Sequence, residues 1–411
     1  MSVSRREFLT RGATTVAVGL AVPPWLAKMV WAQDALEGRA PGGAGARTLV
    51  VVQLTGGNDG INTVIPYSND AYKRNRPTLA IPDTQVLRLN DSIGLNPAMT
   101  GLKGLYDKGK LAIVQGVGYP NPNRSHFRSM EIWQTANPDK IEAEGWVGKY
   151  LDAVRQGRAS ALTGINIGNE ASEAFQSAHA AVPTIQGLAN FGFAFPRNAE
   201  GDERSAVLRR IQTASSAATP HGDFIRQVGQ ETYDSADKIR AGIGKYHSTV
   251  AYPKGAFGTG LQEIAQLIAA NLGTRVFYIS TSGFDTHSGQ ARRQPQLLQD
   301  VSDGLTAFQS DMDQMGASDR VLTVAFSEFG RRVHENAGGG TDHGTASEMF
   351  VLGGSVKGGL YGDYPSLTNL DAGDLKFTTD FRSVYATLLD RWLGANSEVV
   401  LGGRYENLKF V

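Results

Sequence analysis

Short apolar runs recur along the chain and alternate with longer amphipathic stretches. The first run, 48–54, is rich in β-branched residues and ends at Gly56-Gly57, which is typical of a buried parallel strand. Comparable runs cover 111–115, 162–167, 275–281, 321–326 and 349–352. Helical patterns lie between them at 97–108, 125–135, 147–155, 261–272, 295–315 and 380–393. This alternation predicts an α/β fold with a central, mostly parallel sheet sandwiched by helices.

The first residues of the chain have the features of an export signal. Arg5-Arg6 precede a moderately apolar stretch that meets Pro23-Pro24, so the stretch is a poor candidate for a membrane span. We therefore predict a twin-arginine signal peptide over 1–32, read by the twin-arginine translocase, and a periplasmic or extracellular location. A flexible linker over 33–46 and a single domain over 47–411 follow, with a helical insertion around 202–248 that carries no strand pattern.

Composition excludes several classes of function. The chain has 40 basic and 40 acidic residues, and residues 1–32 contain four of the basic and one of the acidic ones. The remaining chain therefore has a net charge of about −3, which argues against nucleic acid as a partner. With no cysteine in the chain, disulfides, thiolate metal ligands and a cysteine nucleophile are excluded.

Ligands of such sheets bind beyond the carboxyl ends of the strands, so polar residues at those ends are candidates for a functional site. Asp59 follows the first strand and offers a hard oxygen ligand, although an Asx-type turn is the favoured interpretation of this segment taken alone. Ser125 is expected to open a helix, where it is either a nucleophile in the positive end of the dipole or a plain N-cap. Arg124 and Arg128 flank it and could grip an anionic substrate.

The later strand ends combine carboxylates with imidazoles. Asp285 and His287 lie two positions apart and point the same way in an extended segment, so both can reach one cation. Glu328 follows the next strand, and Asp342-His343 lie on a Gly-rich loop before another one. These residues form a candidate metal site, while a surface ion pair is the alternative for Glu328. Among the remaining histidines, which we interpret mainly as solvated or packing residues, His126 is the first candidate for a further role.

Five motifs together carry a resemblance to a known family. They are Leu54-Thr55-Gly56-Gly57-Asn58-Asp59-Gly60, Pro122-Asn123-Arg124-Ser125-His126-Phe127, Phe284-Asp285-Thr286-His287, Ser327-Glu328-Phe329-Gly330-Arg331 and Gly340-Thr341-Asp342-His343-Gly344. From Thr48 onward the chain resembles the domain-of-unknown-function family 1501, whose members are exported bacterial proteins grouped with the alkaline phosphatase and sulfatase superfamily. The resemblance implies an alkaline phosphatase-like fold with two divalent metals at the strand ends.

The resemblance also implies roles for individual residues. Asp59 matches the first metal-binding Asp, Ser125 the nucleophile, and Asp285 with His287 the first-metal pair. His343 matches the last His ligand, and Asp342 could join it. Glu328 stands where the superfamily usually has Asp-His, which is a departure at the second metal. The absence of cysteine and of the expected proline argues against formylglycine sulfatase chemistry.

The sequence thus favours an exported, metal-dependent hydrolase that acts on a small anionic phosphate or sulfate ester. Imidazole ligands make Zn or Mn the expected divalent ion rather than Mg or Ca. A non-catalytic exported binding or assembly protein that retains the fold is the alternative. The hydrolase interpretation requires that the five motifs converge at one edge of the sheet.

Overall fold

A computed structural model describes residues 46–411, except 155–160, 189–197, 214–219 and 245. The predicted signal peptide and nearly all of the predicted linker lie outside the described residues. Among the residues that are described, no helix is long and apolar enough to cross a membrane.

The centre of the fold is a nine-stranded sheet with the order β11-β5-β10-β9-β1-β8-β6-β7, in which β14 also pairs with β5. The six predicted strands are present in it as β1 (Thr48–Thr55), β5 (Leu111–Gly118), β6 (Gly164–Ile167), β8 (Val276–Ser282), β9 (Val321–Phe326) and β10 (Ser347–Gly353). Three short strands complete it: β7 (Thr184–Ile185), β11 (Gly359–Tyr361) and β14 (Thr379–Asp380). Only β10 runs against its neighbours β5 and β9, which confirms the mostly parallel sheet.

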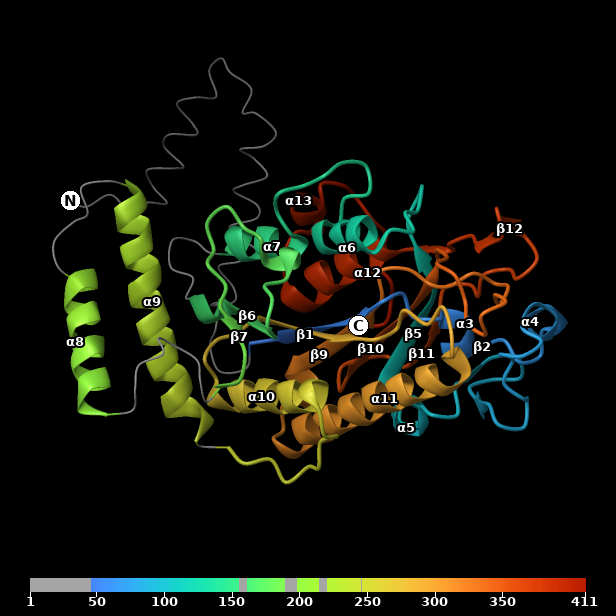
Figure 1. The fold of residues 1–411 in the computed structure, drawn as a ribbon, viewed down its shortest axis with the longest axis horizontal. Helices are drawn as coiled ribbons and strands as arrows, with labels where there is room; N and C mark the ends of the chain where they lie inside the picture. Colours follow the sequence, from blue (N-terminus) through green and yellow to red (C-terminus); the bar gives the residue numbers. More distant parts are fainter. Residues whose placement is uncertain (1–45, 155–160, 189–197, 214–219, 245) are drawn as a thin grey trace, which may run out of the picture. The chain divides into compact units, whose positions relative to one another are not determined.

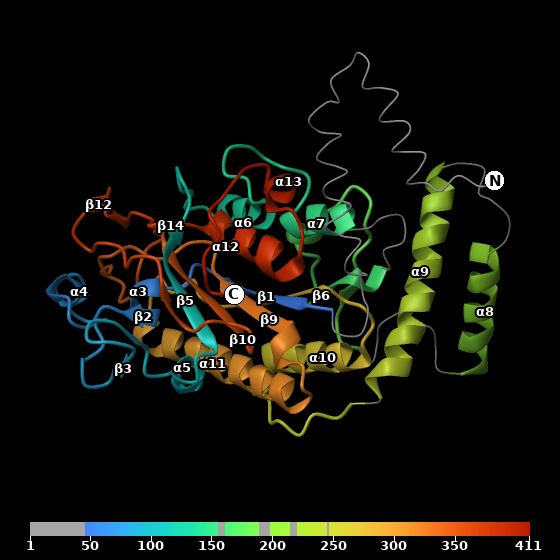
Figure 2. The same cartoon turned by 180° about the vertical axis from the view of Figure 1, so that it is seen from behind.

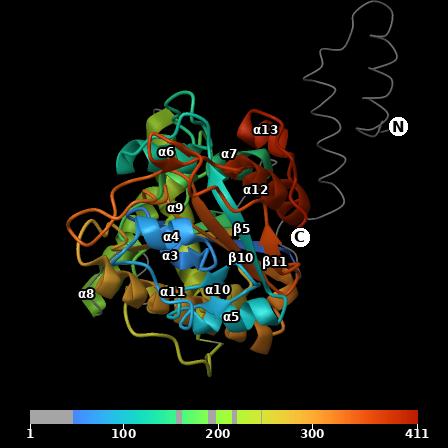
Figure 3. The same ribbon diagram turned by 90° about the vertical axis from the view of Figure 1, so that its right-hand side faces the viewer.

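Helices cover both faces of the sheet, as predicted (Figure 1; Figure 3). Alternate residues of β1 enter two different cores, because successive side chains of a strand point to opposite faces. Val50 and Val52 pack with α5 (Thr100–Asp107), α10 (Ala256–Ala270) and α11 (Gln290–Gln314). Leu49 and Val51 pack on the other side with α6 (His126–Thr135), α7 (Trp146–Val154), α12 (Phe381–Thr387) and α13 (Ser397–Leu401). The sheet is therefore packed between two helical layers.

Smaller elements surround this framework. The region predicted as a helical insertion contains α8 (Ala199–Thr213) and α9 (Pro220–Ile243). Short strands form a three-stranded sheet and a hairpin, which lie toward the same end of the main sheet together with α3 (Gly60–Thr63) and α4 (Asp70–Asn75) (Figure 2). They are β2 (Val64–Ile65), β3 (Leu87–Arg88) and β4 (Gly94–Leu95), and β12 (Leu370–Asp371) with β13 (Asp374–Leu375). Single turns are η1 (Ala161–Thr163), η2 (Glu173–Phe175), η4 (Ser318–Arg320) and the π-helical η5 (Leu388–Leu393).

Strand direction decides which segments meet. Because β1, β5, β8 and β9 run the same way, their carboxyl ends lie at one edge of the sheet. The antiparallel β10 begins at that edge, so the loop before it arrives there as well. The five motifs therefore meet at one edge of the sheet.

Candidate metal centre

Three histidines from three segments converge on one carboxylate. His126 begins α6 after β5, His287 follows β8, and His343 precedes β10. The Nε2 atom of His343 lies 3.2 Å from Asp285 Oδ1, and His287 Nε2 is also 3.2 Å from that oxygen. His126 Nε2 lies 3.6 Å from Asp285 Oδ2. Ligand atoms of His126, Asp285 and His343 all lie within 4.8 Å of one another, a grouping that could hold a metal ion.

Each of these histidines is oriented by a hydrogen-bond acceptor at Nδ1, on the side of the ring that faces away from Asp285. The Nδ1 distances are 2.8 Å to Glu328 Oε1 for His126, 3.2 Å to Asp342 Oδ1 for His287, and 2.9 Å to the carbonyl oxygen of Arg124 for His343. A carboxylate or a carbonyl only accepts, so in the neutral rings Nδ1 carries the proton. This arrangement leaves all three Nε2 lone pairs directed at the Asp285 carboxylate, and it matches the outer carboxylates that orient metal-bound histidines.

The inward face of the group consists of acceptors. His287 Nε2 and His343 Nε2 are only 2.9 Å apart, and in these tautomers neither carries a proton. Two lone pairs and a carboxylate at this separation repel one another unless a cation lies between them. The donor set of imidazole nitrogens and one carboxylate therefore fits a divalent transition metal.

Electrostatics at the site keep Asp285 ionised. Burial, the largest single effect, raises the pKa of Asp285. The hydrogen bond from Arg331 Nη2, at 2.6 Å, the contact with His343 and the charges of Arg331 and His287 together outweigh burial and lower that pKa to about 2. The hydrogen bond to Glu328 raises the pKa of His126, whereas burial lowers the pKa of His343. The amide of Asn336 lowers the pKa of Asp342. Asp285 and Asp342 are therefore charged at neutral pH.

Hydrogen bonds from Arg331 link the converging segments to one another. Its side chain is fully buried and donates to the carbonyl oxygens of Gly57, at 2.6 Å, and Thr341, at 2.8 Å, as well as to Asp285. Glu328, also fully buried, accepts a hydrogen bond from the backbone N–H of Gly56 at 2.8 Å. The alternative of a surface ion pair between Glu328 and Arg331 is wrong, because both side chains are buried and bind other partners.

Asp59 lies outside the converging group. Its side chain is fully buried, where the guanidinium of Arg76 and the amide of Gln290 donate to its oxygens. Gln290 Oε1 in turn accepts from Thr286, at 3.1 Å, and Thr341, at 2.7 Å, which adjoin the metal-site residues. Asp59 therefore supports the loops that carry the site, and we do not include it among our proposed metal ligands.

Ser125 is the N-cap residue of the ten-residue helix α6. It is exposed, and its side chain makes no capping hydrogen bond, so it is not the plain N-cap considered above. The residues on either side contact the histidine group, Arg124 through its carbonyl oxygen and His126 through its ring. Arg124 itself forms an ion pair with the buried Asp374. Arg128 binds Glu131 at 2.7 Å and the carbonyl oxygen of Pro138 at 3.1 Å, so its guanidinium is engaged by α6 and by the segment that follows this helix.

Sequence reasoning left out several residues that the geometry brings into the site. His126 was a secondary candidate, although its place directly after Ser125 in the Asn-Arg-Ser-His-Phe motif was an available signal. Arg331 stands in another motif, Ser-Glu-Phe-Gly-Arg, and was considered only as a surface residue. Nothing in the pattern indicated Arg76, which reaches Asp59 from the loop that follows α4.

Comparison with known proteins identifies the family. The family described as "Protein of unknown function (DUF1501)" matches residues 46–402. The chain belongs to this family. No curated protein matches the chain.

Several solved structures resemble this member of the family. The sulfatase PsFucS1 from Pseudoalteromonas sp. is 13% identical, with a TM-score of 0.41 over 94% of this chain and 75% of that one. A protein in the alkaline phosphatase superfamily from Vibrio parahaemolyticus is 9% identical, with a TM-score of 0.38 over 87% and 69%. The soluble domain of lipooligosaccharide phosphoethanolamine transferase A from Neisseria meningitidis is 9% identical, with a TM-score of 0.38 over 87% and 93%. At such scores these similarities do not decide function.

Proposed function

We propose that this protein is an exported metal-dependent hydrolase of phosphate or sulfate esters. One observation carries the proposal: three histidines from separate segments turn their Nε2 atoms toward Asp285, and each is oriented by its own acceptor at Nδ1. Such a set of outer acceptors costs conformational freedom and has no use in a group of solvated surface histidines.

The proposed ligands are His126, His287, His343 and Asp285, with Glu328 and Asp342 as orienting carboxylates. Imidazole-rich donor sets suit Zn, and Mn is the second choice; Mg and Ca prefer oxygen ligands. A bound divalent ion would supply Lewis acidity toward the ester oxygens and lower the pKa of a nearby hydroxyl.

Ser125 is the proposed nucleophile. Its hydroxyl, at the positive end of α6 and free of any capping bond, is available for attack. Attack would form a bond from Ser125 Oγ to phosphorus or sulfur while the bond to the leaving alcohol oxygen breaks, and that oxygen takes up a proton. Water would then release the phosphate or sulfate and restore the serine, so the net change is ester plus water to alcohol plus anion.

Export through the twin-arginine pathway is part of the proposal and rests on Arg5-Arg6 and the apolar stretch after them. Because this pathway carries folded proteins, it suits a protein that acquires its metal before export. Replacing both arginines with lysine should retain the full-length protein in the cytoplasm, whereas the unaltered protein should reach the periplasm. Equal export of both forms would contradict this part of the proposal.

The decisive experiment measures metal and turnover on the same preparation. Protein purified without chelator is analysed for bound metals and then tested on phosphomonoesters, phosphodiesters and sulfate esters. We expect about one equivalent of Zn or Mn per chain, and hydrolysis that is lost in Ser125→Ala while metal is retained. Protein that contains no metal and stays inactive after metal is resupplied would rule the proposal out.

The alternative function is a non-catalytic exported binding protein. The engagement of Asp59 by Arg76 and Gln290 favours it, because the resemblance assigns Asp59 to a metal site. A binding protein would retain metal and show no turnover with any ester in the panel.

A further inference from the structure

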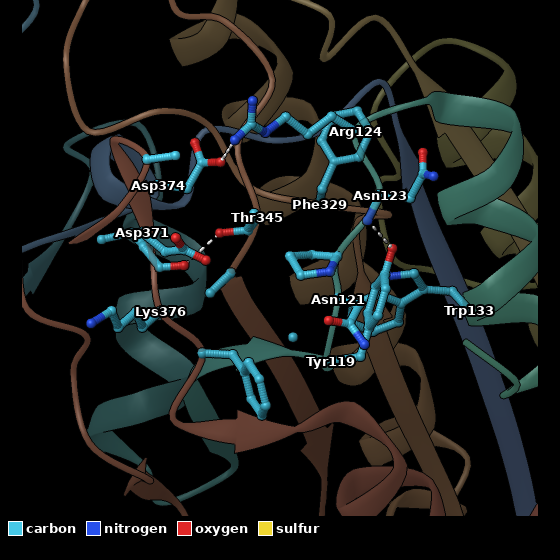
Figure 4. A pocket seen from close by; sticks show the side chains of 16 residues that line it. Tyr119, Asn121, Asn123, Arg124, Trp133, Phe329, Thr345, Asp371, Asp374 and Lys376 are labelled. Atoms are coloured by element: carbon cyan, nitrogen blue, oxygen red, sulfur yellow. Dashed lines mark hydrogen bonds and ion pairs between the residues drawn. The ribbon is translucent and has the colours of Figure 1, made fainter. Parts of the chain in front are cut away.

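A cavity of about 760 Å³ adjoins the candidate metal centre. It lies between the loop after β5 and the hairpin of β12 and β13 (Figure 4). Two residues connect it to the histidines. Arg124 lines it with its side chain and accepts from His343 with its carbonyl oxygen. Phe329 also lines it and packs against the rings of His126, at 5.0 Å, and His343, at 4.7 Å.

This cavity is larger than the ester group requires, since volumes of ~300–1,000 Å³ accommodate whole small-molecule ligands. The alcohol part of the substrate is the portion that would fill it. The lining of the cavity therefore indicates which alcohol is favoured.

The formal charges of the side chains that line the cavity sum to zero. Arg124 and Lys376 provide two positive charges, and Asp371 and Asp374 provide two negative charges. A strongly charged leaving group is not favoured by such a wall. Asp374 is only 2% exposed, and the guanidinium of Arg124 binds its Oδ2.

The second oxygen of Asp374 needs a donor. Oδ1 is buried and has no hydrogen-bond partner in the described part of the chain, since the nearest cation, Arg332 Nε, remains at 3.5 Å. A buried acceptor without a donor is costly, so a ligand that donates to it gains affinity. Because two arginines already balance the Asp374 charge, a neutral hydroxyl is favoured over an ammonium group.

The rest of the wall suits a ring that carries several hydroxyls. Four aromatic residues line the cavity: Phe377, which is 37% exposed, and the nearly buried Tyr119, Trp133 and Phe329. Figure 4 shows the last three at the cavity wall. The indole N–H of Trp133 is buried and has no acceptor among the described residues, so it can donate to a ligand oxygen. A hydroxylated ring provides donors, acceptors and apolar C–H faces together.

We propose that this cavity binds the alcohol part of the substrate and that this part is a carbohydrate. This proposal rests on the proposed function only in that it treats the bound sugar as part of a substrate. Sugar binding itself can be measured without turnover. Asp374 is assigned as the residue that selects a hydroxylated leaving group.

The test measures binding of neutral sugars by saturation-transfer NMR and intrinsic tryptophan fluorescence. The probes are glucose, galactose, mannose, lactose and cellobiose, with cyclohexanol as a ring that lacks the additional hydroxyls. We expect at least one sugar to bind the full chain and cyclohexanol to bind at least about tenfold more weakly, since a hydrogen bond to a charged group contributes about that factor.

Variants locate the binding. Asp374→Asn should weaken sugar binding by about tenfold or more. Since Asp374 is buried, Phe377→Ala serves as a second variant: Phe377 is 37% exposed, and its loss should weaken binding about two- to tenfold. Phe127→Ala is the matched control, because Phe127 is 91% exposed and is not part of the cavity wall, so sugar binding should not change.

His287→Ala separates the two proposals, because His287 contributes to the candidate metal centre and does not line the cavity. It should lose metal and retain sugar binding. Turnover of aryl esters without any sugar binding would overturn the carbohydrate inference alone, as would equal binding of cyclohexanol or an unchanged affinity in both cavity variants. Sugar binding in a protein that holds no metal would contradict the proposed hydrolase and leave this inference supported.

Discussion

Replacing Glu328 with Gln isolates the effect of one charge behind the candidate metal centre. Glu328 Oε1 accepts from His126 Nδ1 and from Gly56 N, both at 2.8 Å, and a Gln carbonyl oxygen can accept both bonds. The second carboxylate oxygen, Oε2, lies 3.1 Å from Ser327 Oγ. The hydroxyl proton of Ser327 is directed at the carbonyl oxygen of Leu54, so a Gln N–H in place of Oε2 can donate to Ser327 Oγ. The variant therefore retains the hydrogen bonds and loses only the charge.

We expect the loss of this charge to weaken metal binding without unfolding the protein. Removing an outer carboxylate from a metal-bound histidine typically costs about 10- to 100-fold in affinity, equivalent to about 1.4–2.7 kcal/mol. Competition with a chromophoric chelator measures the affinity directly, and circular dichroism checks the fold. Wild-type affinity in Glu328→Gln would refute the assignment of Glu328 as the residue that orients His126.

The pH dependence of the metal-free protein provides a second readout. Glu328 raises the pKa of His126, so the ion pair stabilises the folded state below the ordinary histidine pKa of about 6.5. That contribution is lost as the pH rises through the folded-state pKa. Wild type should therefore exceed Glu328→Gln in melting temperature at about pH 5.5, and the difference should shrink toward about pH 9. A difference that is constant across this range would contradict the coupling.

Three further predictions concern other parts of the site. His343→Ala should lose metal in elemental analysis, whereas His334→Ala should retain it, because among the described residues the His334 ring bonds to the neighbouring Glu335 carbonyl oxygen and to no member of the candidate metal centre. Equal metal content in the two variants would exclude His343 as a ligand. Ser125→Ala should abolish ester hydrolysis and change the free energy of unfolding by less than about 0.5 kcal/mol, since no cap bond is lost; a large loss of stability would indicate a structural role. Arg331→Met should destabilise the fold by about 3–5 kcal/mol in urea unfolding, because it removes the Arg331 hydrogen bonds to Asp285 and to several carbonyl oxygens. A near-neutral effect would show that these hydrogen bonds do not hold the loops together.

The fold could be predicted largely because its signals are local. Each long strand is a continuous apolar run that must be buried on both faces, and β1 is one example, with Leu49 through Val52 fully buried. The two-residue strands β2, β3 and β4 could not be predicted, since no periodicity can be detected over two positions. The hairpin of β12 and β13, which lines the cavity, could not be predicted for the same reason.

Residues at the candidate site could be found from their place after strands, but their roles could not be assigned. Whether a carboxylate binds a metal or orients a histidine depends on what lies against it in space. Glu328 contacts a histidine 202 positions away, and Asp342 contacts one 55 positions away. Asp59 was a plausible ligand until the buried guanidinium of Arg76 was seen to engage it. No sequence pattern contains this information.

At Glu328 the sequence departs from the expected motif, yet an imidazole still occupies the corresponding place in the structure. The resemblance leads to an expectation of Asp-His after β9, with both residues as ligands, whereas this chain has Ser327-Glu328. The structure supplies an imidazole at that place from another segment, His126 of α6, and the carboxylate of Glu328 lies behind it. The longer side chain allows a fully buried carboxylate to reach Nδ1 at 2.8 Å while it also accepts from the first loop. A site that looks depleted in the sequence therefore retains its imidazole donors in space, which is why we favour a single histidine-rich centre over a lost second metal site.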